Sequence, residues 1–305
     1  MSKVIGIDLG TTFSAIASLD DLGNPEVLAS LEDNRKITAS AIYIDGKNVI
    51  VGDRALTYIK NEPNKVVLQT KREMENDVVY SVNDGKWVGD KDLVDSYTPA
   101  QVSSLILKKL KDYTTDVKQV VITVPAMFAE KARQATLDAA KLADLEVIEL
   151  INEPTAAVLH YASLPGVEVG GRVMIFDLGG GTFDVTFAEV KNKKVDVLTS
   201  RGDKYLGGKD FDKEITKLIQ KKYFEIHKVE IDIENNKEYI QKAEEIKKIL
   251  SVKNKVSTNI NGPKGPQQIE ITQEEFEESI QTYIEKIKML IEEAMEASGM
   301  KPSRI

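Results

Sequence analysis

The chain has 305 residues, a formal net charge of −8 at pH 7, no cysteine and two histidines. This length allows two domains or lobes, each with its own hydrophobic core, and two lobes imply a cleft. The lack of cysteine excludes disulfide frameworks, thiolate zinc sites and cysteine nucleophiles, and the acidic balance argues against nucleic-acid and membrane-surface partners. His160 and His227 lie in helical or charged contexts, so we expect ordinary structural histidines.

The N-terminal residues predict a strand rather than a targeting segment. MSKVIGIDLG has no long apolar region, and no window approaches the roughly 20 apolar residues that span a membrane. We therefore expect a cytoplasmic protein.

One short pattern occurs twice in the chain. KVIGIDLGTTFSAIASL (3–19) and RVMIFDLGGGTFDVTFAEV (172–190) each run from an apolar strand through Asp-Leu-Gly into a turn of small residues and then alternating apolar positions. The alternation predicts a second strand after each turn. Neither a Rossmann fingerprint nor a P-loop is matched, because both need glycines that open a helix.

Strands and helices alternate between the two copies. The segment TPAQ carries Thr98 as N-cap, Pro99 at the first helical position and Gln101 as the partner in a capping box. The elements expected after this helix are a strand at 119–124, a helix near 127–143, a strand at 145–150 and a helix opened at 152. This alternation predicts a mixed α/β sheet.

The second copy is followed by a shorter set of elements. They are hairpins over 172–200, charged helical material to about residue 255, a hairpin at NGPKGPQQIEI, and a helix from Thr272, with Glu275 at N3, to Gly299. In the first copy, the helix that begins after Thr98 is followed by a strand, a helix, a second strand and a second helix. In the second copy, the corresponding helix from Thr272 is not followed by these elements. We therefore expect residues 1–168 to form lobe I, and residues 169–305 to form a lobe II that is incomplete at its C-terminal end and exposes apolar sheet surface.

The glycine turns suit phosphate binding. A turn of glycine and threonine presents backbone N–H groups with no bulky side chain in the way. Asp8 and Asp177 end the first strand of each copy, and paired carboxylates beside phosphates usually hold a divalent cation. One such turn would equally fit a tight hairpin, but the repetition favours two turns that grip one polyphosphate.

Five motifs together resemble the 70-kDa heat-shock chaperones of the DnaK type. They are IGIDLGTTFS, VVITVPAMFAEKARQAT, LINEPTAAVLHY, IFDLGGGTFDV and YLGGKDFD, in the family's order and with roughly its spacing. The resemblance implies an α/β, actin-like ATPase fold: two RNase H-like lobes with inserted subdomains (IA and IB, then IIA and IIB) around a nucleotide cleft. It also implies that ATP hydrolysis is coupled to the folding of client proteins.

The resemblance assigns roles around the phosphates. The residues similar to the two phosphate loops are Gly10, Thr11, Thr12, Gly179, Gly180, Gly181 and Thr182. Asp8 and Asp177 match carboxylates that hold hydrated Mg²⁺ and, with the phosphates, K⁺. Lys71 matches the lysine that approaches the γ-phosphate, and Glu153 the carboxylate near the attacking water. The catalytic set implied is Lys71, Glu153, Asp177 and Thr182. Taken alone, Lys71 fits a solvated surface lysine and Glu153 a helix N-terminal carboxylate.

A second set of residues resembles the family's adenosine site. Glu244, Lys247 and Ser251 lie on one polar stripe of an amphipathic helix, a pattern that alone fits a solvated face with one ion pair. In the family this trio contacts adenosine, and Gly207 and Gly208 match a glycine turn beside it. The cofactors implied are therefore ATP or ADP with Mg²⁺ and K⁺.

The partners implied are unfolded clients bound by a domain absent from this sequence, a nucleotide exchange factor and a J-domain cochaperone. Glu149 stands where members often carry a basic residue that meets the J-domain, which weakens that last expectation. Pro125 and Arg133 resemble residues of the family that relay signals to the client-binding domain. Taken alone, Pro125 fits a residue that ends a strand, and Arg133 fits a surface residue of a helix. The alternatives left open are a filament-forming actin-like ATPase, a small-molecule kinase of the same superfamily and a scaffold that has lost nucleotide binding.

Overall fold

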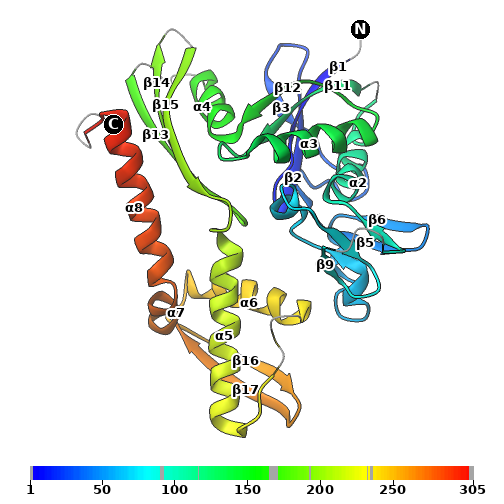
Figure 1. Ribbon diagram of the computed structural model, residues 1–305, viewed down its shortest axis with the longest axis vertical. Coiled ribbons are helices and arrows are strands. Elements are labelled where there is room, and N and C mark those ends of the chain that lie inside the picture. The colour runs from blue at the N-terminus through cyan, green and yellow to red at the C-terminus, as the bar shows by residue number, and fades with distance from the viewer. Residues whose placement is uncertain are drawn as a thin grey trace. The chain divides into compact units, whose positions relative to one another are not determined.

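The computed structural model describes residues 3–89, 93–115, 117–164, 171–191, 194–231, 233 and 236–301 (Figure 1). The chain divides into two compact units, one made of Met1–Tyr205 with Leu290–Ile305 and the other of Leu206–Met289. The predicted lobe boundary at 168/169 lies outside the described residues, so the division into lobes I and II stays a prediction.

The larger unit is built on a six-stranded mixed sheet with the order β12-β11-β1-β2-β3, in which β4 also pairs with β2. The strands are β1 (Lys3–Asp8), β2 (Phe13–Leu19), β3 (Pro25–Val27), β4 (Thr38–Ala39), β11 (Val117–Val124) and β12 (Glu146–Asn152). β1 is parallel to β11 and antiparallel to β2, which confirms the predicted hairpin and mixed sheet. Asp8 and Thr123 pair at the ends of neighbouring strands, and Thr123 Oγ1 donates to Asp8 Oδ1 at 3.2 Å.

Helices α2 (Pro99–Lys111) and α3 (Glu130–Leu142) supply the apolar side chains that cover this sheet. The Thr98 side-chain oxygen accepts a hydrogen bond from the Gln101 N–H, and the Gln101 side-chain oxygen accepts one from the Thr98 N–H. The predicted capping box is therefore confirmed. Ile106 and Leu107 of α2 and Ala139 of α3 join the core made by Ile5 and Ile122 of the strands. Burial of these apolar surfaces is the main stabilising contribution to the unit.

Two small sheets and several short helices lie between β4 and α2 in the chain. The elements are β5 (Ile42–Asp45), β6 (Asn48–Val51), β7 (Val66–Val67), β8 (Val79–Ser81), β9 (Lys86–Val88), β10 (Ser96–Tyr97), α1 (Asp53–Leu56) and the 3₁₀ helices Pro63–Lys65 and Thr70–Glu73. The sheet orders are β6-β5-β7 and β10-β8-β9. The second 3₁₀ helix carries Lys71 into the interior of the unit.

A second sheet of the same unit contains the second glycine turn. Its strands are β13 (Gly171–Leu178), β14 (Phe183–Lys191) and β15 (Lys194–Asp203), all antiparallel. Helix α4 (Glu153–Ser163) contacts strands of this sheet and of the six-stranded sheet. Within the described residues β13 is an edge strand, and its Met174, Phe176 and Leu178 are 38%, 47% and 37% exposed. The expected exposure of apolar sheet surface is therefore present.

The smaller unit packs two helices against a hairpin. Its elements are α5 (Gly208–His227), α6 (Lys237–Leu250), β16 (Lys255–Gly262), β17 (Gly265–Thr272), α7 (Gln273–Ser279) and the first part of α8 (Gln281–Ser298). Tyr223 and Ile246 belong to a core that the hairpin completes with Ile260 and Ile271. The cap of Thr272 with Glu275 is confirmed.

The single helix predicted over 272–299 is wrong in one respect. The backbone at Ile280 (φ −97°, ψ 1°) leaves the helical region and divides it into α7 and α8. Three residues later, the Tyr283 ring packs edge-on to Phe211 of α5, with ring centroids 5.8 Å apart. None of the helices in the described residues combines the length and apolar character needed to cross a membrane.

Candidate functional site

The first glycine turn connects β1 to β2 and has its backbone held by two serines. The Gly10 N–H donates to Ser14 Oγ at 3.2 Å, and Ser40 Oγ donates to Gly10 O at 2.8 Å. A Cβ on Gly10 would lie 2.0 Å from the carbonyl oxygen of Phe13, so a larger residue does not fit. These contacts hold the tip that carries Thr11 and Thr12 in one conformation.

The second glycine turn, between β13 and β14, lies directly against the first. A Cβ on Gly180 would lie 2.1 Å from Thr12 Oγ1, and a Cβ on Gly181 would lie 2.6 Å from Thr11 Oγ1. A Cβ at either glycine would overlap these threonine side chains, so glycine lets the second turn lie this close to Thr11 and Thr12. The structure therefore brings all the predicted phosphate-loop residues of the two copies together.

A cavity of about 480 Å³ opens beside the paired turns. Its lining residues are Asp8, Gly10, Thr11, Thr12, Phe13, Lys71, Thr123, Glu153, Ala156, Ala157, Asp177, Gly179, Gly180 and Thr182. The predicted carboxylates and Lys71 thus share one concave site with the two turns.

Lys71 and Glu153 form an ion pair inside this site. Their side chains are only 8% and 15% exposed, so the alternative reading of Lys71 as a solvated surface lysine is wrong. Burial raises the pKa of Glu153, and the positive charge of Lys71 opposes that rise. Burial likewise raises the pKa of Asp177. The positive charge of Lys71 opposes this rise, and the negative charge of Asp8 adds to it.

Asp184 is a further carboxylate that the sequence analysis did not single out. It lies opposite Asp177 in the β13–β14 pairing and is 2% exposed. Burial, followed by the charges of Glu153 and Asp177, raises its pKa to about 7. The sequence does contain a signal for Asp184. In GTFDV it lies between Phe183 and Val185, so strand alternation places its side chain on the opposite face of the sheet from theirs.

Replacing Asp184 with asparagine should stabilise the ligand-free protein at high pH. A folded-state pKa of about 7, above the ordinary 3.8, means that folding favours the protonated carboxyl. The wild type therefore loses stability as the pH rises from about 4 to about 7, whereas asparagine does not titrate. We expect a gain on the order of 4 kcal/mol at pH 8 and little gain near pH 4.

Thermal unfolding of the two proteins across this pH range measures the effect. Asp196→Asn provides the control, because Asp196 is an exposed carboxylate on the neighbouring strand β15. A stability difference between Asp184→Asn and wild type that does not depend on pH would contradict the assignment.

Arg133 has hydrogen-bond partners beside the helix that begins with Glu153. Arg133 Nη2 donates to Asn152 Oδ1 at 2.7 Å and Nε donates to the carbonyl of Phe128 at 3.1 Å. Arg133 is therefore half-buried rather than a free surface residue, and it contacts the N-cap that precedes Glu153. Pro125 follows directly after β11. Their role as a relay stays a prediction.

The predicted adenosine residues lie in the smaller unit and cluster there. Lys247 Nζ donates to Gly208 O at 2.9 Å, and Ser251 Oγ donates to Lys247 O at 3.2 Å. Lys209, next to Gly208, lies 3.9 Å from a carboxylate oxygen of Glu244. Gly207 is the N-cap of α5, so the glycine pair opens the helix that these side chains contact.

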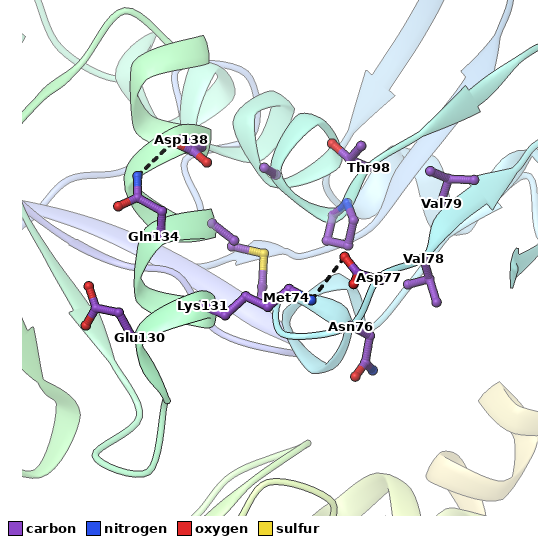
Figure 2. A pocket seen from close by; sticks show the side chains of 13 residues that line it. Met74, Asn76, Asp77, Val78, Val79, Thr98, Glu130, Lys131, Gln134 and Asp138 are labelled. Carbon is purple, nitrogen blue, oxygen red and sulfur yellow. Dashed lines mark hydrogen bonds and ion pairs between the residues drawn. The ribbon is translucent and has the colours of Figure 1, made fainter. Parts of the chain in front are cut away.

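A larger cavity, of about 740 Å³, lies elsewhere in the larger unit. Figure 2 shows the start of α2, the polar face of α3 and the segment Met74–Val79 around it. Lys131 Nζ lies 3.0 Å from Asp77 Oδ1 across its wall, and Gln134 donates to Asp138 at 2.9 Å. None of the predicted site residues lines it.

The comparison with known families agrees with this arrangement. A family model described as Hsp70 protein matches residues 4–305, which include both glycine turns and helix α6. The mixed sheets and helices agree with the actin-like ATPase fold of that family, so the predicted fold class is confirmed. The chain belongs to the Hsp70 family.

Proposed function

We propose that this chain binds and hydrolyses ATP as the nucleotide-binding domain of a DnaK-type chaperone and couples hydrolysis to the folding of client proteins. A chaperone ATPase domain in the general sense follows from the family. The observation that carries the specific proposal is the close packing of Gly180 on Thr12 and of Gly181 on Thr11. Two turns of this kind present N–H and hydroxyl donors to one polyphosphate.

The donor and acceptor groups of the site fit phosphates and a hydrated cation. Thr12 Oγ1 and Asp184 Oδ1 are buried, and neither has a hydrogen-bond partner among the described residues. The carboxylates of Asp8, Glu153 and Asp177 line the cavity together with the ammonium of Lys71, and the buried Asp184 carboxylate interacts with the charges of Glu153, Asp177 and Lys71. This excess negative charge favours a bound cation.

Asp8 and Asp177 would hold Mg²⁺ mainly through its waters. The described residues contain no group of three or more His, Cys, Asp or Glu side chains arranged as direct metal ligands. Mg²⁺ retains several waters in most protein sites, so two carboxylates beside phosphates are sufficient. When bound, the cation would neutralise charge on the phosphate oxygens, and K⁺ would add to this.

Lys71 and Glu153 would carry the catalytic roles. The Lys71 ammonium stabilises negative charge at the γ-phosphate, and Glu153 orients the attacking water. Thr182, at the end of the second turn, contacts the phosphate. Phosphoryl transfer depends mainly on such positioning and electrostatic stabilisation.

The other expectations are part of the same proposal. Gly207, Gly208, Glu244, Lys247 and Ser251 bind adenosine. The protein works in the cytoplasm with unfolded clients and a nucleotide exchange factor, without a nucleic-acid or membrane partner. Glu149 is exposed on β12, where an acidic side chain disfavours J-domain contact.

Calorimetric titration of the chain with ATP, with and without Mg²⁺, tests the proposal. We expect saturable binding that strengthens with Mg²⁺, together with phosphate release that needs no acceptor substrate. ATP-dependent pelleting would favour a filament-forming ATPase instead, and hydrolysis that needs a small-molecule acceptor would favour a kinase. Absence of both binding and hydrolysis would overturn the proposal.

A further inference from the structure

Arg72, which follows Lys71 in the chain, contacts the second glycine turn. Its Nε and Nη2 atoms donate to the carbonyl oxygen of Gly181 at 3.0 and 2.7 Å. These are charge-assisted hydrogen bonds across 109 residues of sequence. The 3₁₀ helix Thr70–Glu73 thus points Lys71 at Glu153 and the neighbouring Arg72 at the turn.

This contact fixes the direction of one peptide group. In a trans peptide, the carbonyl of Gly181 and the N–H of Thr182 point in opposite directions. Gly180 and Thr182 line the cavity beside the turns, whereas Gly181 does not. Arg72 does not line the cavity either, so its bonds direct the Gly181 carbonyl, which would repel a phosphate, away from the cavity, and the Thr182 N–H of the same peptide points the opposite way.

Neighbouring contacts hold the Arg72 segment itself in place. Glu75 forms an ion pair with Lys204, which follows β15 of the sheet that carries the turn. Asn76 Nδ2 donates to Glu73 Oε2 at 2.9 Å. On its other side, Gly181 packs against Thr11 of the first turn. The peptide is thus confined between Thr11 and an anchored guanidinium.

We propose that Arg72 is a positioning residue for ATP hydrolysis. It aims the Thr182 N–H at the phosphates and keeps the second turn in register with Lys71. The inference rests on the proposed ATPase function for its kinetic consequence, but the orientation of the peptide is a property of the protein without nucleotide.

Arg72→Ala should slow single-turnover ATP hydrolysis by roughly 10-fold to 10²-fold, because a small misplacement of a transition-state donor costs about this much. ATP affinity should change less than about threefold, since the other donors of both turns remain. Guanidinium chloride at low millimolar concentration should restore part of the lost rate, and methylammonium chloride should not. A rate equal to that of wild type, or losses in rate and affinity that guanidinium does not rescue, would overturn the proposal.

A nucleotide-free measurement separates this inference from the proposed function. In ¹⁵N-threonine-labelled protein, Arg72→Ala should shift the Thr182 amide resonance, and guanidinium should move it back. Arg172→Ala is the matched control, because Arg172 lies on β13 of the same sheet and pairs only loosely with Glu189, at 3.8 Å. An unchanged Thr182 resonance in Arg72→Ala would overturn the positioning role even if the wild type proves not to hydrolyse ATP.

Discussion

Replacing Lys71 with alanine should slow single-turnover ATP hydrolysis by on the order of 10²-fold or more while ATP still binds. The Lys71 ammonium is buried beside Glu153 in the cavity that the two glycine turns border. A charge held at low exposure interacts strongly with an approaching anion, and that interaction matters most when charge develops at the γ-phosphoryl group. Rapid mixing of ATP with a molar excess of enzyme measures the rate of the chemical step, and calorimetry measures the affinity for ATP.

The ion pair with Glu153 requires a second variant. Alanine at position 71 leaves the Glu153 carboxylate buried without its partner, which can destabilise a protein by about 3–5 kcal/mol. Combining Lys71→Ala with Glu153→Gln removes both charges and should unfold at a higher temperature than Lys71→Ala alone, yet remain inactive. Lys65→Ala is the control, because Lys65 pairs with Asp45 and Glu62 away from the cavity. If Lys71→Ala loses rate and affinity equally, Lys71 only anchors the phosphate and has no separate role in the chemical step.

Local sequence patterns predicted the elements that depend on local chemistry. The capping boxes at Thr98 and Thr272 depend on a partner three residues away, and both are present. The strand-turn-strand nature of the glycine motifs followed from period-two alternation and is also present. Such features need only neighbours in the chain, so one sequence is enough to predict them.

Contacts between distant segments could not be predicted in this way. The partner of Lys71 lies 82 residues away and that of Arg72 lies 109 residues away. No local pattern distinguishes these two from solvated basic residues, and only the likeness of the motifs to a family pointed to Lys71. Asp184 was missed for a similar reason, because its raised pKa depends first on burial and then on the charges of the distant Glu153 and the cross-strand Asp177. The break at Ile280 likewise falls within a continuous helical pattern, beside the contact of Tyr283 with Phe211 of another helix.

Replacing both Asp8 and Asp177 should remove most of the Mg²⁺ dependence of nucleotide binding. The two carboxylates line one cavity, and each lies near the end of its strand, β1 or β13, just before a glycine turn. A hydrogen bond to a charged group contributes about 1.5–3 kcal/mol, so losing one from each carboxylate to metal-bound water corresponds to roughly 10²-fold to 10⁴-fold in affinity. Titrations of ATP in Mg²⁺ and in EDTA should therefore differ far less for Asp8→Ala with Asp177→Ala than for wild type.

The stability of the same double variant shows whether a loss of binding comes from misfolding. Burial, with a smaller contribution from the charge of Asp8, raises the pKa of Asp177, so without ligand the ionised Asp177 carboxylate opposes folding above the ordinary carboxyl range. Asp8→Asn with Asp177→Asn should accordingly unfold at a higher temperature than wild type at pH 8, although it binds Mg²⁺-ATP more weakly. Asp112→Asn with Asp196→Asn changes the net charge equally at exposed positions of the same unit and should leave both properties unaltered. Greater stability together with weaker metal-dependent binding is the signature of a cation site whose carboxylates are held together against their own repulsion. If the Mg²⁺-dependent affinity is the same in the double variant and the wild type, the cation lies elsewhere and the paired aspartates serve only the fold.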